Sequence, residues 1–168
     1  MSAPVVEHVL RLPTAEATRD LGRRLGRVLR AGDLLVLSGD LGAGKTTLTQ
    51  GIGEGLGVRG PVTSPTFVLS RVHPSLAGGP ALVHVDAYRL ADALELEDLD
   101  LETDLAASVV VVEWGRGLVE DLAGDRLEVD LHRDVRVAPD VPAETGEVDE
   151  RRTAVLRGVG QRWAGLAP

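Results

Sequence analysis

The sequence contains no cysteine, only four aromatic residues and a single lysine. Without cysteine, the chain cannot form disulfides, use a thiolate nucleophile or build a cysteine–zinc site. With so few aromatics, the core must be built from Leu, Val and Ala. No apolar run approaches the ~20 residues that cross a membrane, and the first residues lack the basic and apolar segments of a signal peptide. We therefore expect a cytoplasmic protein with no membrane contact.

The charge balance is acidic, with 26 acidic and 18 basic residues and a formal net charge of −8. Phosphate neutralisation dominates nucleic-acid affinity, so this balance is a poor match for a protein that grips RNA alone. Lys45 is the one lysine among the basic residues, which indicates a task that arginine cannot perform. The length of 168 residues predicts a single domain over 1–168 that can bury a core without a disulfide or metal.

Apolar runs and helical stripes alternate along the chain, which predicts an α/β protein. We expect a mostly parallel central sheet with antiparallel edge strands. Residues 139–150 are acidic and contain proline, and they predict a mobile loop. The helix after residue 44 is rich in glycine and must be held by packing. The expected strands are 5–12, 34–37, 67–69, 82–85, 108–112, 126–132 and 151–159, and the expected helices are 14–30, 44–56, 91–107 and 161–166.

Residues 39–46 read GDLGAGKT and match the pattern G-x-x-x-x-G-K-[ST]. The glycines let backbone N–H groups point at phosphate oxygens, and the following helix adds its positive N-terminus. Lys45 places a compact ammonium on the β- and γ-phosphates, and Thr46 offers a hydroxyl to Mg²⁺. An apolar strand precedes the motif and a helix follows it. The sequence therefore predicts a phosphate-binding loop in a P-loop NTPase-type three-layer fold.

Two carboxylates end neighbouring apolar runs, Asp86 after 82–85 and Glu113 after 108–112. In open α/β sheets, ligands bind outside the carboxyl ends of the strands. Either side chain could hold Mg²⁺ or orient an attacking water. Each alone could also be a solvated residue at a strand end, but beside a phosphate loop we favour function for both. The sequence leaves open which carboxylate performs which task.

Three further residues have two readings each. Thr66 could sense the γ-phosphate as a switch residue does, or cap a β-turn. Trp114 could anchor a partner beside the site, or belong to the core. His84 shares a strand face with Asp86, and we favour a structural role for it. The arginines along 19–30 suggest a nucleic-acid face, but a solvated helix face is favoured in a chain this acidic.

Four blocks follow one another in a distinctive order: GDLGAGKTT at 39–47, SPTF at 64–67, HVDAYRL at 84–90 and VEW at 112–114. Their order and spacing resemble the bacterial TsaE (YjeE) family. The resemblance implies a P-loop ATPase that supports formation of threonylcarbamoyladenosine beside the tRNA anticodon. It implies ATP and Mg²⁺ as cofactors and TsaD-like and TsaB-like proteins as partners. tRNA would be reached only through those partners.

The resemblance also assigns roles to residues. Thr46 and Glu113 would serve magnesium, and Asp86 would be a catalytic or supporting carboxylate. Trp114 would lie beside the nucleotide and the partner surface. Thr14 and Glu16 would contact adenine. The phosphates would be held by Leu41, Gly42, Ala43, Gly44, Lys45, Thr46 and Thr47.

Two other functions remain open from the sequence. A small-molecule kinase on the same scaffold would need a basic lid, whereas residues 91–107 carry acids and no base. A nucleotide-gated adaptor would bind ATP without hydrolysing it. Consumption of ATP with no added acceptor distinguishes an ATPase from both, because a kinase without its substrate is nearly silent and an adaptor is always silent. We expect an ATPase that is slow alone and stimulated by partners.

Overall fold

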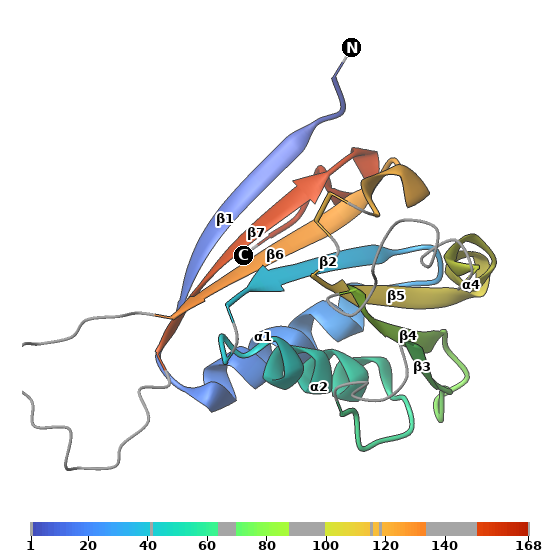
Figure 1. Ribbon diagram of the computed structural model, residues 1–168, viewed down its shortest axis with the longest axis horizontal. Helices are drawn as coiled ribbons and strands as arrows, with labels where there is room; N and C mark the ends of the chain where they lie inside the picture. Colours follow the sequence, from blue (N-terminus) through green and yellow to red (C-terminus); the bar gives the residue numbers. More distant parts are fainter. Residues whose placement is uncertain are drawn as a thin grey trace, which may run out of the picture.

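The computed structural model describes residues 2–40, 42–63, 70–87, 100–114, 116–117, 119–133 and 151–167. One seven-stranded sheet runs through these residues, in the order β1-β7-β6-β2-β5-β4-β3 (Figure 1). Its strands are β1 (Val5–Leu12), β2 (Leu34–Gly39), β3 (Ser70–His73), β4 (Ala81–Asp86), β5 (Ser108–Glu113), β6 (Arg126–Arg133) and β7 (Arg152–Val159).

The four central strands β6, β2, β5 and β4 are parallel, and the outer strands pair antiparallel. This confirms the predicted α/β sheet. The continuous apolar runs of β2 and β5 are buried, as expected for strands covered on both faces. β6 and β7 alternate between buried and half-exposed residues, the pattern of an antiparallel strand with one solvated face.

Helices α1 (Ala15–Val28) and α2 (Lys45–Leu56) lie side by side on one face of the sheet (Figure 1). They cover Leu35, Leu37 and Val111. On the other face, Leu34, Val36 and the other outward-facing residues of the central strands pack with α4 (Leu101–Ala107). The alternation of side chains along each strand therefore builds two cores, one on each side of the sheet.

Glycines allow α1 and α2 to touch backbone to backbone. A Cβ at Gly22 would lie 2.3 Å from the carbonyl oxygen of Leu48, and one at Gly51 would lie 2.1 Å from that of Arg19. Gly26 and Gly55 are equally crowded by the opposite helix. The glycines that weaken α2 as an isolated helix are thus required for its close packing on α1, and this packing stabilises α2 in the fold.

Most expected elements are found within one or two residues of their predicted bounds. Two segments differ: no strand was predicted over β3, and 161–166 contains only the 3-10 helix η3 (Gln161–Trp163). Trp163 and Leu166 each donate to the carbonyl three residues earlier, so the segment winds as tight turns between Gly160 and Gly165. A second 3-10 helix, η2, spans Glu120–Leu122.

Several predictions fall outside the described residues: the strand 67–69, most of the helix 91–107 and the loop 139–150. The last turns of that helix appear as α4. Among the described helices, none has the length and apolar character needed to cross a membrane.

Candidate functional site

The predicted phosphate loop connects the central strand β2 to the start of α2. Gly39, Gly42 and Gly44 have φ values of +150°, +79° and +100°, which residues with a side chain rarely adopt. A Cβ at Gly39 would also lie 2.5 Å from the carbonyl oxygen of Leu131 on β6. Gly44 is the N-cap of α2 and provides no capping side chain, so it leaves the first-turn N–H groups open to an anion.

Lys45, the first residue of α2, is buried with 7% of its surface exposed. Its Nζ donates to the carbonyl oxygens of Gly39 at 2.7 Å and Asp40 at 3.2 Å. Burial lowers the pKa of the ammonium, while the carboxylates of Glu113, Asp86 and Asp40 oppose that shift. The single lysine therefore lies inside the loop, within the field of both predicted carboxylates.

Asp86 and Glu113 are register partners at the carboxyl ends of β4 and β5. Side chains alternate between the two faces along a strand, so Asp86 shares a face with Leu82 on β4, and Glu113 shares a face with Val111 on β5. Leu82 and Val111 lie in the core under α1 and α2, so both carboxylates lie on the α2 side of the sheet. They are 9% and 4% exposed. His84, fully buried, donates from Nε2 to Oε1 of Glu113 at 3.1 Å.

Two neighbouring buried carboxylates repel each other and need positive charge nearby. Lys45 supplies one such charge, and a divalent cation beside Thr46 at the start of α2 would supply more. Hard carboxylate and hydroxyl oxygens are the ligands that Mg²⁺ takes when phosphates complete its coordination. The donor set of Thr46, Glu113 and Asp86 thus fits Mg²⁺ bound together with a nucleotide.

Trp114 covers the lysine. Its ring centre lies 4.2 Å from Lys45 Nζ, within the range of a cation–π contact. The residue has φ +62°, which is unusual for a bulky side chain, and its N–H donates to the carbonyl oxygen of Leu37 at 3.0 Å. Trp114 is half-buried, whereas Trp163 is the core tryptophan with 2% exposure. The structure therefore favours a place at the site for Trp114 over the core reading.

The start of α1 borders the loop. Thr14 is the N-cap of α1 as predicted, and its Oγ1 accepts from Ala17 N at 3.0 Å. Glu16, in the first turn, is held at 2.7 Å by Arg23. Thr18, which is 1% exposed, has its methyl group 3.6 Å from where a Cβ of Gly44 would stand. Thr14 and Glu16 thus lie on the element that flanks the loop, and their predicted adenine contacts stay a prediction.

Arg152 is a loop contact that the sequence did not indicate. This residue, 9% exposed at the start of β7, donates from Nη2 to the carbonyl oxygen of Gly42 at 3.1 Å. A loop that turns its N–H groups inward must turn carbonyls outward, and the guanidinium binds one of them. Arg152 follows Gly42 by more than a hundred residues, so only the pairing of β7 beside β6 reveals the contact.

The remaining predicted site residues have simple outcomes. Ala43 is buried in the loop, and Thr46 and Thr47 are half-buried in the first turn of α2. Leu41 and Thr66 lie outside the described residues. Arg24 and Arg27 of α1 are exposed, as expected for a solvated helix face. Arg19 and Arg23 instead form ion pairs with Glu54 of α2.

Comparison with known proteins identifies the family. The model of the family "Threonylcarbamoyl adenosine biosynthesis protein TsaE" matches residues 12–138, which include the loop and both carboxylates. This chain belongs to the TsaE family. The resemblance predicted from the four sequence blocks is thereby confirmed.

Relatives from several bacteria carry the name tRNA threonylcarbamoyladenosine biosynthesis protein TsaE. One from Streptomyces coelicolor is 61% identical over 147 residues, or 87% of this chain and 93% of the relative. One from Mycobacterium tuberculosis is 56% identical, covering 76% and 82%. One from Bacillus subtilis is 40% identical, covering 70% and 73%.

The TsaE-family fold is also found among solved structures. The crystal structure of YdiB from Bacillus subtilis superposes with a TM-score of 0.71 at 30% sequence identity. The match covers 96% of this chain and 92% of YdiB. The fold described above is therefore shared with YdiB over most of both chains.

Proposed function

We propose that the protein binds ATP with Mg²⁺ and hydrolyses it in support of threonylcarbamoyl modification of tRNA, next to the anticodon. Membership of the TsaE family supports the pathway. The observation that carries the hydrolysis is the buried Lys45 at the start of α2, placed in the field of Glu113 and Asp86. tRNA is a cytoplasmic molecule, so the proposal includes a cytoplasmic location.

Each residue has a part in the proposed reaction. The loop N–H groups from Gly42 to Thr47 and the Lys45 ammonium bind phosphate oxygens. Thr46 and Glu113 would hold Mg²⁺, which would neutralise charge on the phosphoryl group that passes from ATP to water. His84 fixes the orientation of Glu113 through its 3.1 Å hydrogen bond. Asp86 lies beside Glu113 and orients the attacking water or receives its proton.

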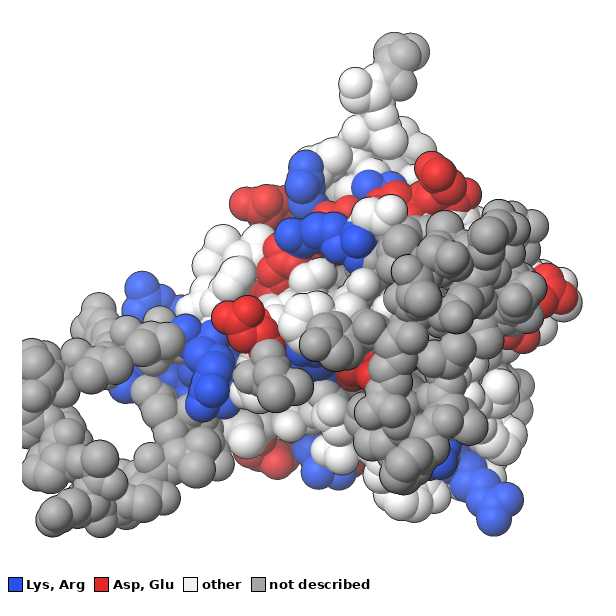
Figure 2. Space-filling view, viewed as in Figure 1, with Lys and Arg blue, Asp and Glu red and all other residues white. Residues whose placement is uncertain are grey.

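Partner proteins resembling TsaD and TsaB complete the proposal, with tRNA held by them. Two properties of this chain support an indirect role toward tRNA. The net charge is −8. In Figure 2, acidic and basic side chains are interspersed over the upper part of the described face, and the basic side chains that gather at the left cover only a small part of it. Slow hydrolysis alone and faster hydrolysis with partners are the expected behaviour.

The deciding experiment measures phosphate release from ATP without an acceptor, with and without the partner pair. We expect slow release that the partners increase, and near-complete loss for Lys45→Ala, which removes the charge placed at the β- and γ-phosphates. Thr46→Ala should raise the Mg²⁺ requirement more than it weakens nucleotide binding. Release by Lys45→Ala at the wild-type rate would show that the site is wrongly assigned. No release by the wild type under either condition would favour a kinase or an adaptor.

A further inference from the structure

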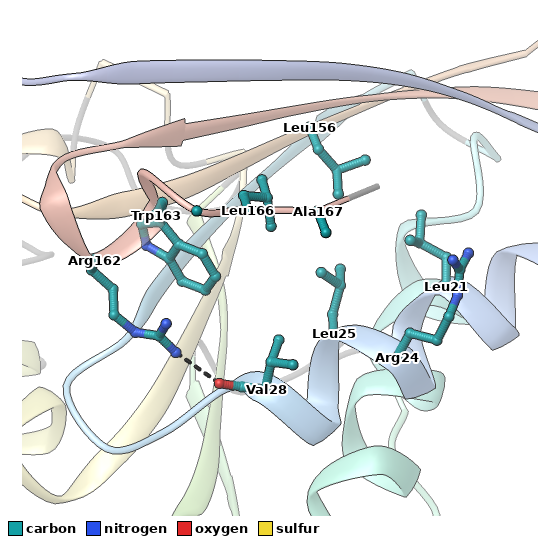
Figure 3. A pocket seen from close by; sticks show the side chains of 10 residues that line it. Leu21, Arg24, Leu25, Val28, Leu156, Arg162, Trp163, Leu166 and Ala167 are labelled. Carbon is teal, nitrogen blue, oxygen red and sulfur yellow. Dashed lines mark hydrogen bonds between the residues drawn. The ribbon is translucent and has the colours of Figure 1, made fainter.

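A cavity of about 450 Å³ lies between α1 and the C-terminal turn. Figure 3 shows Leu25 and Val28 of α1 facing Leu156, Trp163 and Leu166 across this space. Its size falls within the range of protein ligand pockets, and its lining is mostly apolar. Val28 is 54% exposed and is one of the exposed large apolar residues of the described structure.

A second hollow, of about 410 Å³, adjoins the first along α1. Arg24 lines both, so the two hollows meet at its side chain. The second hollow is lined mainly by arginine, from the end of β1 and from α1. We call the two hollows together the α1 groove. The second hollow is lined by Arg11, Leu12, Ala17, Asp20, Arg23, Arg24 and Arg27.

The charges in the α1 groove are only partly compensated. Arg23 forms ion pairs with Glu16, Asp20 and Glu54. Arg11, Arg24 and Arg27 are exposed, and none of them forms an ion pair with another described residue. In a chain with eight more acidic than basic residues, three uncompensated arginines beside an apolar cavity point to a ligand with carboxylates and apolar groups.

We propose that the α1 groove docks an acidic amphipathic segment of a partner protein. Apolar side chains of the segment fill the cavity over Val28, and its carboxylates pair with Arg24 and Arg27, in the manner of helix-in-groove recognition. Nucleic acid would satisfy the arginines but leave the apolar cavity empty, which is why a peptide is favoured. The groove shares no residue with the phosphate site, so the proposal does not depend on ATP hydrolysis.

The test is selection from a random displayed peptide library on the full chain, with counter-selection on Arg24→Glu/Arg27→Glu. We expect selected peptides to combine Asp or Glu with spaced Leu, Ile, Phe or Trp. They should bind the wild type at least about tenfold more tightly than the charge-reversed variant, a factor equal to about 1.4 kcal/mol. Val28→Asp should weaken them similarly, and Arg59→Glu, an exposed arginine outside the groove, should not.

Arg24, Arg27 and Val28 are exposed, so these variants should melt like the wild type, and Arg24→Ala/Arg27→Ala replaces the charge reversal if it does not fold. Salt should weaken the peptides, because exposed charges are screened. Three results would overturn the proposal. One is selected peptides that lack acidic residues or bind both proteins equally. Another is an RNA oligonucleotide that distinguishes the wild type from the variant as strongly. The third is self-association of the wild type that the charge reversal abolishes.

Discussion

Asp86 and Glu113 lie side by side at the ends of β4 and β5, and their charges can be removed while their shapes are kept. We expect Asp86→Asn and Glu113→Gln each to lower ATP hydrolysis at least about tenfold, or roughly 1.4 kcal/mol of activation free energy. Glu113→Gln should lose more Mg²⁺ affinity. Calorimetric titration of Mg-ADP measures this, with Asp121→Asn, an exposed carboxylate on η2, as the control. A Mg-ADP affinity of Glu113→Gln equal to that of the wild type would remove Glu113 from the magnesium ligands.

Trp114 is the second residue whose role a substitution can decide. It is half-buried over Lys45, so Trp114→Ala should keep the fold and most ATP binding, yet lose stimulation by the proposed TsaD-like and TsaB-like partners. Trp114→Phe keeps an aromatic face and should recover part of the stimulation. Thermal melting and partner-stimulated hydrolysis are measured on both. If Trp114→Ala lowers the unfolding free energy by about 3–5 kcal/mol, as truncation of a buried tryptophan does, Trp114 belongs instead to the core.

At the residue scale, the sequence predicted the parts of the site that follow from local spacing. Lys45 and Thr46 belong to one motif, and Asp86 and Glu113 end recognisable apolar runs. Arg152 and Thr18 also border the loop, but their positions depend on strand and helix pairing between distant segments. No local pattern encodes that pairing, so these two contacts became visible only in the fold.

At the scale of elements, the contact between α1 and α2 leaves no room for side chains at its glycines. Gly51→Ala would place a Cβ 2.1 Å from the carbonyl oxygen of Arg19. We expect a net loss of about 1–3 kcal/mol of unfolding free energy, although alanine gains up to about 1 kcal/mol in helix propensity. Urea denaturation measures the change. Gly124→Ala, where a Cβ meets nothing within 4 Å, is the control and should unfold near the wild-type midpoint. A Gly51→Ala protein as stable as the wild type would contradict backbone contact between the helices.

Helices and strands could be predicted because their apolar residues recur with different periods. β2 and β5 are short continuous apolar runs, which are typical of strands buried on both faces. The glycines of α2 show the limit of that method. Propensity identifies Gly51 and Gly55 as weak points, whereas the structure shows that each faces the backbone of α1. The propensities of the α2 residues therefore do not reveal that contact with α1 requires glycine at these positions.

Across the whole molecule, Arg162 ties the C-terminal turn to the connection between α1 and β2. It binds Asp33 through two hydrogen bonds of 3.0 and 2.9 Å and the carbonyl oxygen of Val28 at 2.7 Å. Asp33 is 4% exposed, so Arg162→Met leaves a buried carboxylate without its guanidinium. We expect a loss of about 3–5 kcal/mol in unfolding free energy.

Thermal or urea unfolding of matched variants checks this expectation. Arg116→Met removes an exposed partner of Asp130 and should change stability by no more than about 1 kcal/mol. Adding Asp33→Asn to Arg162→Met should recover part of the loss, because the uncompensated charge is then gone. Equal melting of the two single arginine variants would show that the tie contributes nothing.

The order of the strands in the sheet could not be predicted from the sequence, for a related reason. Alternating apolar runs predicted a parallel centre with antiparallel edges, and the structure confirms both. Which outer strand pairs with which depends on contacts between the two ends of the chain, and β1 pairs with β7 rather than with the adjacent β2. Apolar patterning specifies which face of a strand is buried, and it does not specify its neighbour.

The pairing of β1 with β7 has a consequence for biosynthesis. Val5 aligns with Val159 and Leu12 with Arg152, so β1 cannot pair until β7, which lies far later in the chain, has been synthesised. Until then β1 exposes valines and an unpaired edge, which is a template for the wrong neighbour. The central strands and α2 can assemble earlier on the emerging chain. Closure of the sheet at this edge must therefore follow synthesis of β7, and a chain truncated before β7 leaves β1 without its only hydrogen-bonded neighbour in the described sheet.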